Sequence, residues 1–219
     1  MTFVIGVVSQ KGGVGKSTIA RLLGREMAAG GLRVKIADLD IQQATSYHWA
    51  KRRAEAKLEP EVRIETFQSV KTALAEAGQF DVFIIDGAPH ASRETREIAK
   101  AADLIVIPTG QAVDDLYPTV LLAHDLRKEG IPMSKVAIAL WKISDSGPEQ
   151  RAARVYLERS GYNVLKGDVP FRTAYGKASD EGRALSETNF RTLNRRAEEL
   201  AQSIVDAAAA AREKERAVA

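Results

Sequence analysis

The feature that most restricts the fold of this chain is a glycine-rich segment near its N-terminus, Gln10 to Thr18, with the sequence QKGGVGKST. An apolar run at 3–8 precedes the segment and a helix-like run at 19–29 follows it. A strand that leads through a glycine loop into a helix is the context in which backbone N–H groups turn inward and bind phosphate oxygens. The segment therefore predicts a phosphate-binding loop on an α/β scaffold.

The residue types inside the loop fit this role. Gly12, Gly13 and Gly15 carry no side chain that would block a phosphate, and they tolerate unusual backbone angles. Lys16 is placed to reach the β- and γ-phosphates, and the hydroxyl of Ser17 is placed to ligate Mg²⁺. The spacing predicts a nucleoside triphosphate as the ligand.

The loop departs from the usual G-x-x-x-x-G-K-[ST] spacing, because Gln10 replaces the first glycine and a second lysine, Lys11, follows it. The run KGGVGKST resembles the deviant phosphate loop of the ParA/MinD group of ATPases. The resemblance implies that Lys11 is the signature lysine, which reaches across a dimer interface to the phosphates bound by the other subunit. It implies catalytic roles for Lys11, Lys16 and Asp40. The expected nucleotide contacts in the loop are Lys11, Gly12, Gly13, Val14, Gly15, Lys16, Ser17 and Thr18.

Apolar runs alternate with helix-like segments over nearly the whole chain, and the runs are continuous, as in strands buried on both faces of a parallel sheet. Strands are expected at Phe3–Ser9, Val34–Asp38, Val62–Phe67, Val82–Asp86, Leu104–Pro108, Val136–Trp141 and Tyr162–Leu165. Helices are expected at about 18–29, 42–57, 69–77, 91–101, 114–129, 147–160 and 187–216. This order predicts a doubly wound, mostly parallel sheet with helices on both faces. We expect residues 1–219 to form a single P-loop ATPase domain with a C-terminal helix from about 187.

Carboxylates follow the second predicted strand, which ends in Asp38-Leu39-Asp40. Alternation along a strand places Asp38 and Asp40 on the same side of its tip, and ligands of such sheets bind at the carboxyl ends of the strands. The two carboxylates can therefore serve a metal and a water molecule. The segment resembles the Asp-x-Asp-Pro-Gln motif of the family, with Ile41 in place of the proline, which implies that Asp40 orients the attacking water. Strand-end carboxylates that face solvent are the alternative.

The fourth predicted strand ends in four apolar residues followed by Asp86, which is typical of a Walker B carboxylate that holds Mg²⁺, usually through water. Gly87 then lets the backbone pass close to the γ-phosphate. We expect Ser17, Asp40 and Asp86 to form the Mg²⁺ site. After the fifth strand, Asp115 matches the aspartate of a family turn that faces the second subunit, so an interface role and a solvated turn both remain open.

Recognition of the nucleotide base is less clearly encoded. The resemblance places the base between Trp141-Lys142 and the segment 169–172, so we expect Pro170 and Phe171 to contact it. Trp141 either stacks on the base or packs in the core, and we favour the core because buried aromatic side chains mostly pack. The expectation of ATP rather than GTP therefore depends on the resemblance.

The surplus of positive charge lies in the C-terminal third, where residues 151–219 hold 13 Lys and Arg against 10 Asp and Glu. An apolar stripe along the last helix is expected to pack on the sheet; it comprises Phe190, Leu193, Ala197, Leu200, Ile204 and Ala208. Basic residues off this stripe are candidates for sequence-independent contacts with DNA phosphates; they are Lys177, Arg183, Arg191, Arg195 and Arg196. A solvated helix face, with Glu198 and Glu199 as partners of the arginines, is the alternative.

Composition excludes several classes of protein. The absence of cysteine excludes disulfides, thiolate metal sites and a cysteine nucleophile. The short N-terminal apolar run is unlike a signal peptide, and no run reaches the ~20 apolar residues that span a bilayer. His48, His90 and His124 show no metal-ligand spacing. The absence of cysteine fits a cytoplasmic protein, and the resemblance to the ParA/MinD group implies that it becomes nucleoid-associated when it binds ATP.

The resemblance implies an ATPase that uses ATP and Mg²⁺, forms a homodimer on ATP binding and binds DNA without sequence preference. A ParB-like activator, bound to a centromere-like site or a cargo, is expected to stimulate hydrolysis, so that the protein segregates plasmid or chromosome DNA or positions a cargo. A MinD-like membrane-positioning ATPase is one alternative, but the tail 207–219 has no large apolar side chain except Val218, so no membrane partner is expected. A metabolic enzyme of the dethiobiotin-synthetase type is the other.

Overall fold

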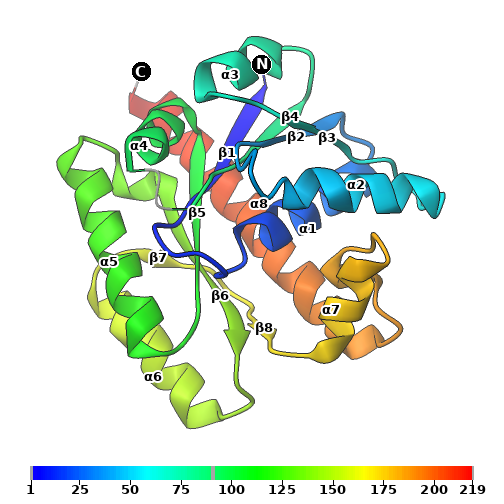
Figure 1. The fold of residues 1–219 in the computed structure, drawn as a ribbon. Coiled ribbons are helices and arrows are strands. Elements are labelled where there is room, and N and C mark those ends of the chain that lie inside the picture. Colours follow the sequence, from blue (N-terminus) through cyan, green and yellow to red (C-terminus); the bar gives the residue numbers. More distant parts are fainter. Residues whose placement is uncertain (1, 90–91, 219) are drawn as a thin grey trace.

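The computed structural model describes residues 2–89 and 92–218, which form a parallel sheet with helices on both faces (Figure 1). The strands are β1 (Phe3–Val7), β2 (Val34–Asp38), β3 (Arg63–Thr66), β4 (Val82–Asp86), β5 (Leu104–Thr109), β6 (Val136–Ile143), β7 (Asn163–Val164) and β8 (Val169–Pro170). The α-helices are α1 (Lys16–Ala29), α2 (Thr45–Glu55), α3 (Val70–Ala77), α4 (Ser92–Ala101), α5 (Val113–Lys128), α6 (Gly147–Arg159), α7 (Thr173–Asp180) and α8 (Arg191–Val218). Two short 3₁₀ turns are η1 (Met133–Lys135) and η2 (Leu185–Glu187).

The strands lie in the order β3-β2-β4-β1-β5-β6-β7, and β8 pairs with the far end of β6. Every strand pair in the described part of the chain is parallel. The carboxyl ends of β1, β2 and β4 therefore meet at one edge of the sheet, where Val7 and Asp38 are both in register with Asp86. The predicted doubly wound sheet is confirmed, and this edge is where its ligand is expected.

Two separate cores hold the layers together, one on each face of the sheet. Alternation along β1 sends Ile5 and Val7 into the core under α1, α2 and α8, and sends Val4 and Val8 into the core under α3, α4, α5 and α6. Helices α1 and α8 lie side by side on the first face (Figure 1). The helix that begins at the phosphate loop is thus fixed by both the sheet and the C-terminal helix.

The C-terminal third differs from the sequence prediction in two respects. Helix α7 and strand β8 were not predicted, because each is too short to show a clear apolar period. The last helix begins at Arg191 rather than near 187, and the expectation that Phe190 packs on the sheet is wrong: its side chain is 57% exposed. Phe190 precedes the helix, and its carbonyl accepts the N–H groups of Leu193 and Asn194.

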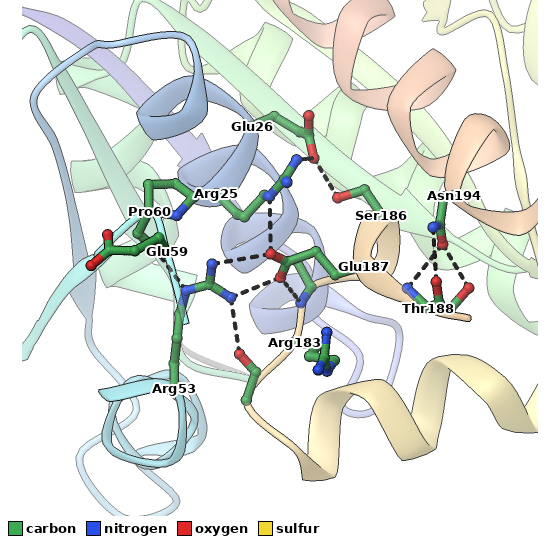
Figure 2. A network of polar contacts seen from close by, with 12 residues as sticks. Arg25, Glu26, Arg53, Glu59, Pro60, Arg183, Ser186, Glu187, Thr188 and Asn194 are labelled. Carbon is green, nitrogen blue, oxygen red and sulfur yellow. Dashed lines mark hydrogen bonds and ion pairs between the residues drawn. The ribbon is translucent and has the colours of Figure 1, made fainter. Parts of the chain in front are cut away.

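A buried ionic network joins α1, α2 and η2 beneath the site (Figure 2). The guanidinium of Arg53, which is 2% exposed, donates to both carboxylate oxygens of Glu187 at 2.7 and 3.1 Å. Arg25 of α1 donates to the same carboxylate at 3.2 Å. Arg53 also donates to the carbonyls of Pro60 and Gly182. The network fixes the position of α2 relative to α1. His90 lies outside the described residues, and among those that are described no helix is both long and apolar enough to cross a membrane.

Candidate functional site

The loop between β1 and α1 has the backbone shape that phosphate binding requires. Gly13 and Gly15 adopt φ angles of 74° and 95°, a region that side-chain-bearing residues rarely enter. A Cβ atom added at Gly12 or Gly13 would meet nothing within 4 Å, so the loop faces open space there. The hydroxyl of Ser9 accepts the N–H of Lys11 at 3.1 Å and fixes the start of the loop.

A recess of about 250 Å³ opens over the loop at the carboxyl ends of β1, β2 and β4. Its lining contains seven of the ten phosphate and metal residues that the sequence predicts, without Lys11, Val14 and Asp86, together with some that the sequence does not predict. The lining residues are Gly12, Gly13, Gly15, Lys16, Ser17, Thr18, Arg21, Asp40, Gln43, Thr45, Gly87, Pro89 and Lys142. The arrangement combines loop N–H groups, two lysines and a carboxylate around one space.

Lys16 lies inside this recess and is only 7% exposed. Burial lowers the pKa of its ammonium group, and the nearby charges of Asp86 and Asp40 offset only part of that effect. A bound phosphate would favour the charged form, because an opposite charge at close range stabilises an ammonium group in a poorly solvated place.

Asp86 lies behind the recess and is almost completely buried. Burial, followed by the charge of Asp38, raises the pKa of this carboxyl to about 6, and hydroxyl groups of Ser17 and Ser46 offset part of the rise. Ser46 Oγ donates to Oδ2 at 2.8 Å. Oδ1 is buried and has no hydrogen-bond partner within the described residues. An unpaired buried carboxylate oxygen beside the Ser17 hydroxyl fits Mg²⁺ held directly or through water.

The two aspartates of β2 have different roles. Asp38 is fully buried, and its carboxylate accepts the N–H groups of Asp40 at 3.1 Å and Ser46 at 3.0 Å. Burial raises its pKa despite these bonds. Asp40 lines the recess and accepts the N–H of Gln43 at 3.1 Å. The expectation that both carboxylates face the ligand is therefore wrong for Asp38, whose oxygens are used to shape the loop into α2.

Lys11 points away from the recess that its own loop forms. Its Nζ atom contacts the carboxylate of Asp115 and lies 3.2 Å from the carbonyl oxygen of Asp114, at the N-terminus of α5. A Cβ atom at Gly110 would overlap Asp115, so the glycine is needed for this arrangement. Asp115 is therefore not a free solvated residue, because it holds Lys11; its interface role stays a prediction.

A second recess of about 330 Å³ adjoins the first, and Thr18 and Lys142 line both. The predicted base contacts Pro170 and Phe171 line it, with Tyr175 of α7 opposite. Trp141 is 5% exposed, which confirms its expected place in the core, and its ring also forms one wall of this recess. A Cβ atom at residue 15 would overlap that ring, so Gly15 serves both the loop and this wall.

Comparisons with known proteins agree with this geometry. Residues 5–185 match the model of the CobQ/CobB/MinD/ParA nucleotide binding domain. The chain belongs to this family. A maintenance of carboxysome distribution protein A from Gloeobacter kilaueensis is 30% identical over 194 residues, which cover 88% of this chain and 87% of that protein.

Solved structures of the MinD/ParA kind share the fold. A variant of Cyanothece McdA in complex with ATP has a TM-score of 0.69 at 15% identity, and the match covers 93% of this chain and 96% of that one. MinD from Pyrococcus horikoshii with Mg-ADP has a TM-score of 0.70 at 16% identity and covers 93% and 96%. Members of the MinD/ParA family are ATPases, and this chain is accordingly an ATPase that uses ATP and Mg²⁺.

Several residues of this MinD/ParA site were not identified from the sequence. Arg21 lies one helical turn after Ser17, a spacing that places it on the same face of α1. Ser46 directly follows the Asp38–Thr45 segment and bridges to Asp86. Lys142 was expected beside the base, but not at the phosphate loop; it adopts a φ of 56° and its Nζ lies 3.4 Å from the carbonyl oxygen of Gly13. A lysine in a left-handed conformation leaves no signal in the sequence.

The candidate DNA contacts of this MinD/ParA chain do not form one unpaired basic patch. Arg195 pairs with Glu199 at 3.1 Å, one turn along α8, and Arg196 pairs with Asp168. Arg183 pairs with Glu181 at 3.3 Å. Lys177 and Arg191 are exposed. The alternative reading of α8, in which glutamates neutralise its arginines, therefore describes Arg195 well.

Proposed function

We propose that the chain is a ParA-like positioning ATPase in which ATP joins two copies into a sandwich dimer. The observation that carries the proposal is the position of Lys11. Its ammonium group is held by Asp115 outside the recess formed by its own loop, whereas Lys16 already lies inside that recess. A cation on this outer face is available to the phosphates of a neighbouring copy.

The residues of one subunit have separate tasks in this proposal. Loop N–H groups and Lys16 bind the phosphates, and Pro170 and Phe171 contact the base. Ser17, Asp40 and Asp86 hold Mg²⁺, which neutralises phosphate charge and orients the phosphates when it is bound. Asp40 orients the attacking water. Lys11 of each subunit stabilises charge on the nucleotide of the other, so that loss of the terminal phosphate weakens the dimer.

The dimer is proposed to bind DNA without sequence preference, and a ParB-like or cargo-bound activator is proposed to stimulate hydrolysis. The relative from Gloeobacter kilaueensis is a carboxysome distribution protein, which supports positioning of a cargo as the task. In this proposal the protein is cytoplasmic, and its ATP-bound form gathers on the DNA of the nucleoid. Hydrolysis near the cargo would then release the protein from the DNA.

The membrane-positioning alternative has little support in the last helix. Ala208 and Ala211 of α8 are buried. The other residues from 209 to 214 are alanines and charged residues, so this part of the helix has no bulky apolar side chain to insert into a membrane. Membrane affinity of an amphipathic helix scales with the apolar area that it can insert. Co-sedimentation of the ATP-bound protein with anionic liposomes should therefore remain at the background level.

The central test is Lys11→Ala. We expect this variant to bind a fluorescent ATP analogue within about twofold of the wild type, because Lys11 lies outside its own phosphate recess. We expect it to stay monomeric by light scattering with Mg²⁺ and a non-hydrolysable analogue, and to lose ATP hydrolysis. Lys16→Ala is the control, since it should lose nucleotide binding itself. A Lys11→Ala protein that dimerises and hydrolyses normally would refute the proposal.

DNA binding is tested separately, with ATP, ADP and a non-hydrolysable analogue over a range of salt concentrations. Sequence-blind binding that needs the triphosphate and weakens steeply with salt is the expected result, because phosphate contacts release counterions. The candidate residues for single substitutions are Lys177, Arg183, Arg191, Arg195 and Arg196. Equal binding in all nucleotide states would contradict an ATP-controlled DNA switch.

A further inference from the structure

A third recess, of about 600 Å³, lies between α1, α2 and α7, next to the phosphate-loop recess. Helices α2 and α7 are neighbours on this side of the molecule (Figure 1). The recess is strongly basic: its lining includes Arg21, His48, Lys51 and Arg52, against one carboxylate, Glu55. Neither the predicted nucleotide contacts nor the predicted DNA contacts include any of these residues.

Arg21 projects into this recess from α1 and is only 8% exposed. Its Nε atom donates to the carbonyl of Ser17 at 2.8 Å and Nη1 donates to the hydroxyl of Ser179 at 3.3 Å. Within the described residues, no carboxylate lies within 4.0 Å of its guanidinium. Burying this cation is costly; the charges of Asp86 and Asp38 offset part of the cost, and an anion in the recess would offset more.

Arg52 adds a second guanidinium to the same space. Its Nη2 atom donates to the carbonyl of Ser179 at 3.3 Å, whereas its Nε atom is buried and has no hydrogen-bond partner in the described part of the chain. The charge of Arg52 also opposes that of Arg21. Arg21 and Arg52 bring two like charges to one recess, and an anion bound there would relieve their repulsion.

We propose that this recess binds a phosphate group, separately from the triphosphate on the loop. Guanidinium groups match the geometry of phosphate oxygens and can donate to two of them at once. The phosphate has two possible sources, the backbone of DNA and free inorganic phosphate. The identification of DNA as the source rests on the proposed function. If DNA is the ligand, the main contact between the protein and DNA lies on the surface between α2 and α7 rather than on α8.

The recess is also connected to the nucleotide site. Arg21, Gln43 and Thr45 line both recesses, and Arg21 donates to the backbone of Ser17, whose hydroxyl lies at the Mg²⁺ site. Thr45 Oγ1 donates to Ser17 Oγ at 3.0 Å. Filling one recess therefore affects the shared wall of the other, which gives a direct route by which nucleotide and the second phosphate influence each other's binding.

The test uses the whole protein with Mg²⁺ and a non-hydrolysable ATP analogue, so that the phosphate loop is occupied. One arm titrates inorganic phosphate by calorimetry, and the other measures binding of a short labelled DNA duplex by fluorescence anisotropy. The variants are Arg52→Gln and the exposed-site change Lys51→Gln, singly and together. Arg93→Gln on α4 is the matched control, because it removes one arginine charge that is already paired with Glu97 and belongs to none of the proposed contacts.

We expect Arg52→Gln to weaken binding about tenfold in one arm, and Arg93→Gln to change it less than twofold. If the ligand is DNA, the slope of log Kd against log salt should fall by about one counterion. A loss in the DNA arm identifies a backbone phosphate, and a loss in the phosphate arm identifies free phosphate.

The proposal is overturned if the double variant, folded by circular dichroism, binds both ligands as the wild type does, or if the wild type binds neither. Lys51→Gln changes an exposed side chain, so it keeps the test decisive if Arg52→Gln folds poorly. A wild type that binds phosphate but no DNA in any nucleotide state would contradict the DNA part of the proposed function while supporting the recess as a phosphate site.

Discussion

At the scale of single residues, the site holds charges that the polypeptide leaves only partly compensated. Asp86 keeps a buried oxygen that has no hydrogen-bond partner among residues 2–89 and 92–218, and Lys16 is an ammonium group in a poorly solvated recess. Such groups lower the stability of the empty protein and gain most when the opposite charge binds. We therefore expect the uncompensated charge to favour the binding of a metal-bound phosphate in this recess.

Asp86→Asn tests this interpretation through pH. The pKa of Asp86 is raised from 3.8 to about 6, so the native state holds a proton that the unfolded chain releases between these values. The stability contributed by this carboxyl is complete below pH 3.8 and is lost as the pH rises through about 6. From pH 5 to pH 8, metal-free Asp86→Asn should gain about 1–3 kcal/mol over the wild type in urea unfolding. The variant should also lose the stabilisation by Mg²⁺ and ATP analogue, and a pH-independent difference would contradict this reading.

Asp115→Ala tests whether the ion pair with Asp115 restrains Lys11 before the dimer forms. The ion pair is partly exposed, with side chains 44% and 23% accessible, so it is worth at most about 1 kcal/mol. Its removal should free Lys11 and lower the dimerisation Kd with ATP analogue about two- to fivefold, as measured by analytical ultracentrifugation. Asp114→Ala is the matched control, because Asp114 reaches Lys11 through its backbone carbonyl. Weaker dimerisation in Asp115→Ala would instead place this carboxylate in the interface.

At the scale of elements, the network of Figure 2 connects the helix that begins at the phosphate loop with the helix that follows the aspartate loop. Glu187 of η2 accepts from Arg53 of α2, Arg25 of α1 and the N–H of Ala184. Burial by itself raises the pKa of Glu187, but these bonds and charges outweigh it, so the pKa lies below its ordinary value of 4.5. The carboxylate is therefore a structural link between two walls of the site.

Glu187→Gln should destabilise the protein by about 3–5 kcal/mol at pH 7, because it leaves the buried guanidinium of Arg53 without its anion. The stability that the ionised carboxylate contributes is present above pH 4.5 and is lost as the pH falls through its lower native pKa. The difference from the wild type in chemical unfolding should therefore shrink below pH 4.5. Glu198→Gln, at an exposed position of α8, should change stability by less than about 0.5 kcal/mol. Equal losses of stability in Glu187→Gln and Glu198→Gln would mean that the ionic network does not stabilise the packing of α1 against α2.

At the scale of the whole molecule, α8 belongs to the same core as the phosphate-loop strand. Ala197, Leu200 and Ile204 are fully buried in the cluster that contains Ile5 and Val7 of β1. The C-terminal helix therefore closes one face of the sheet directly behind the site, and we expect residues 2–89 and 92–218 to unfold as one cooperative unit.

Leu200→Ala should lower the free energy of unfolding by about 2–5 kcal/mol, because it leaves a cavity under the sheet. Gln202→Ala, on the exposed face of the same helix, should stay within about 0.5 kcal/mol of the wild type. Thermal unfolding followed by both circular dichroism and nucleotide fluorescence should show a single transition. Separate transitions for the helix and the site would show that α8 is an independent appendage.

The sequence alone was sufficient to predict the doubly wound sheet and the phosphate-binding loop. Continuous apolar runs report strands buried on both faces, and the glycines at 12, 13 and 15 report a backbone path that few other residues can follow. Asp86 was also predictable, because a carboxylate after a fully apolar strand must emerge at the strand tip. These are local patterns, and local backbone geometry is what a short stretch of sequence encodes.

Only the tertiary structure decided which charges meet. Lys11 and Asp115 are 104 positions apart, and Arg53 meets Glu187 across 134 positions, so no local pattern reports either pair. The same reason explains why the pairing of Arg196 with Asp168, 28 positions earlier, and the basic recess of Arg21 and Arg52 were not foreseen. Ion pairs and recesses depend on the order of strands and the packing of helices, which are fixed when the layers come together.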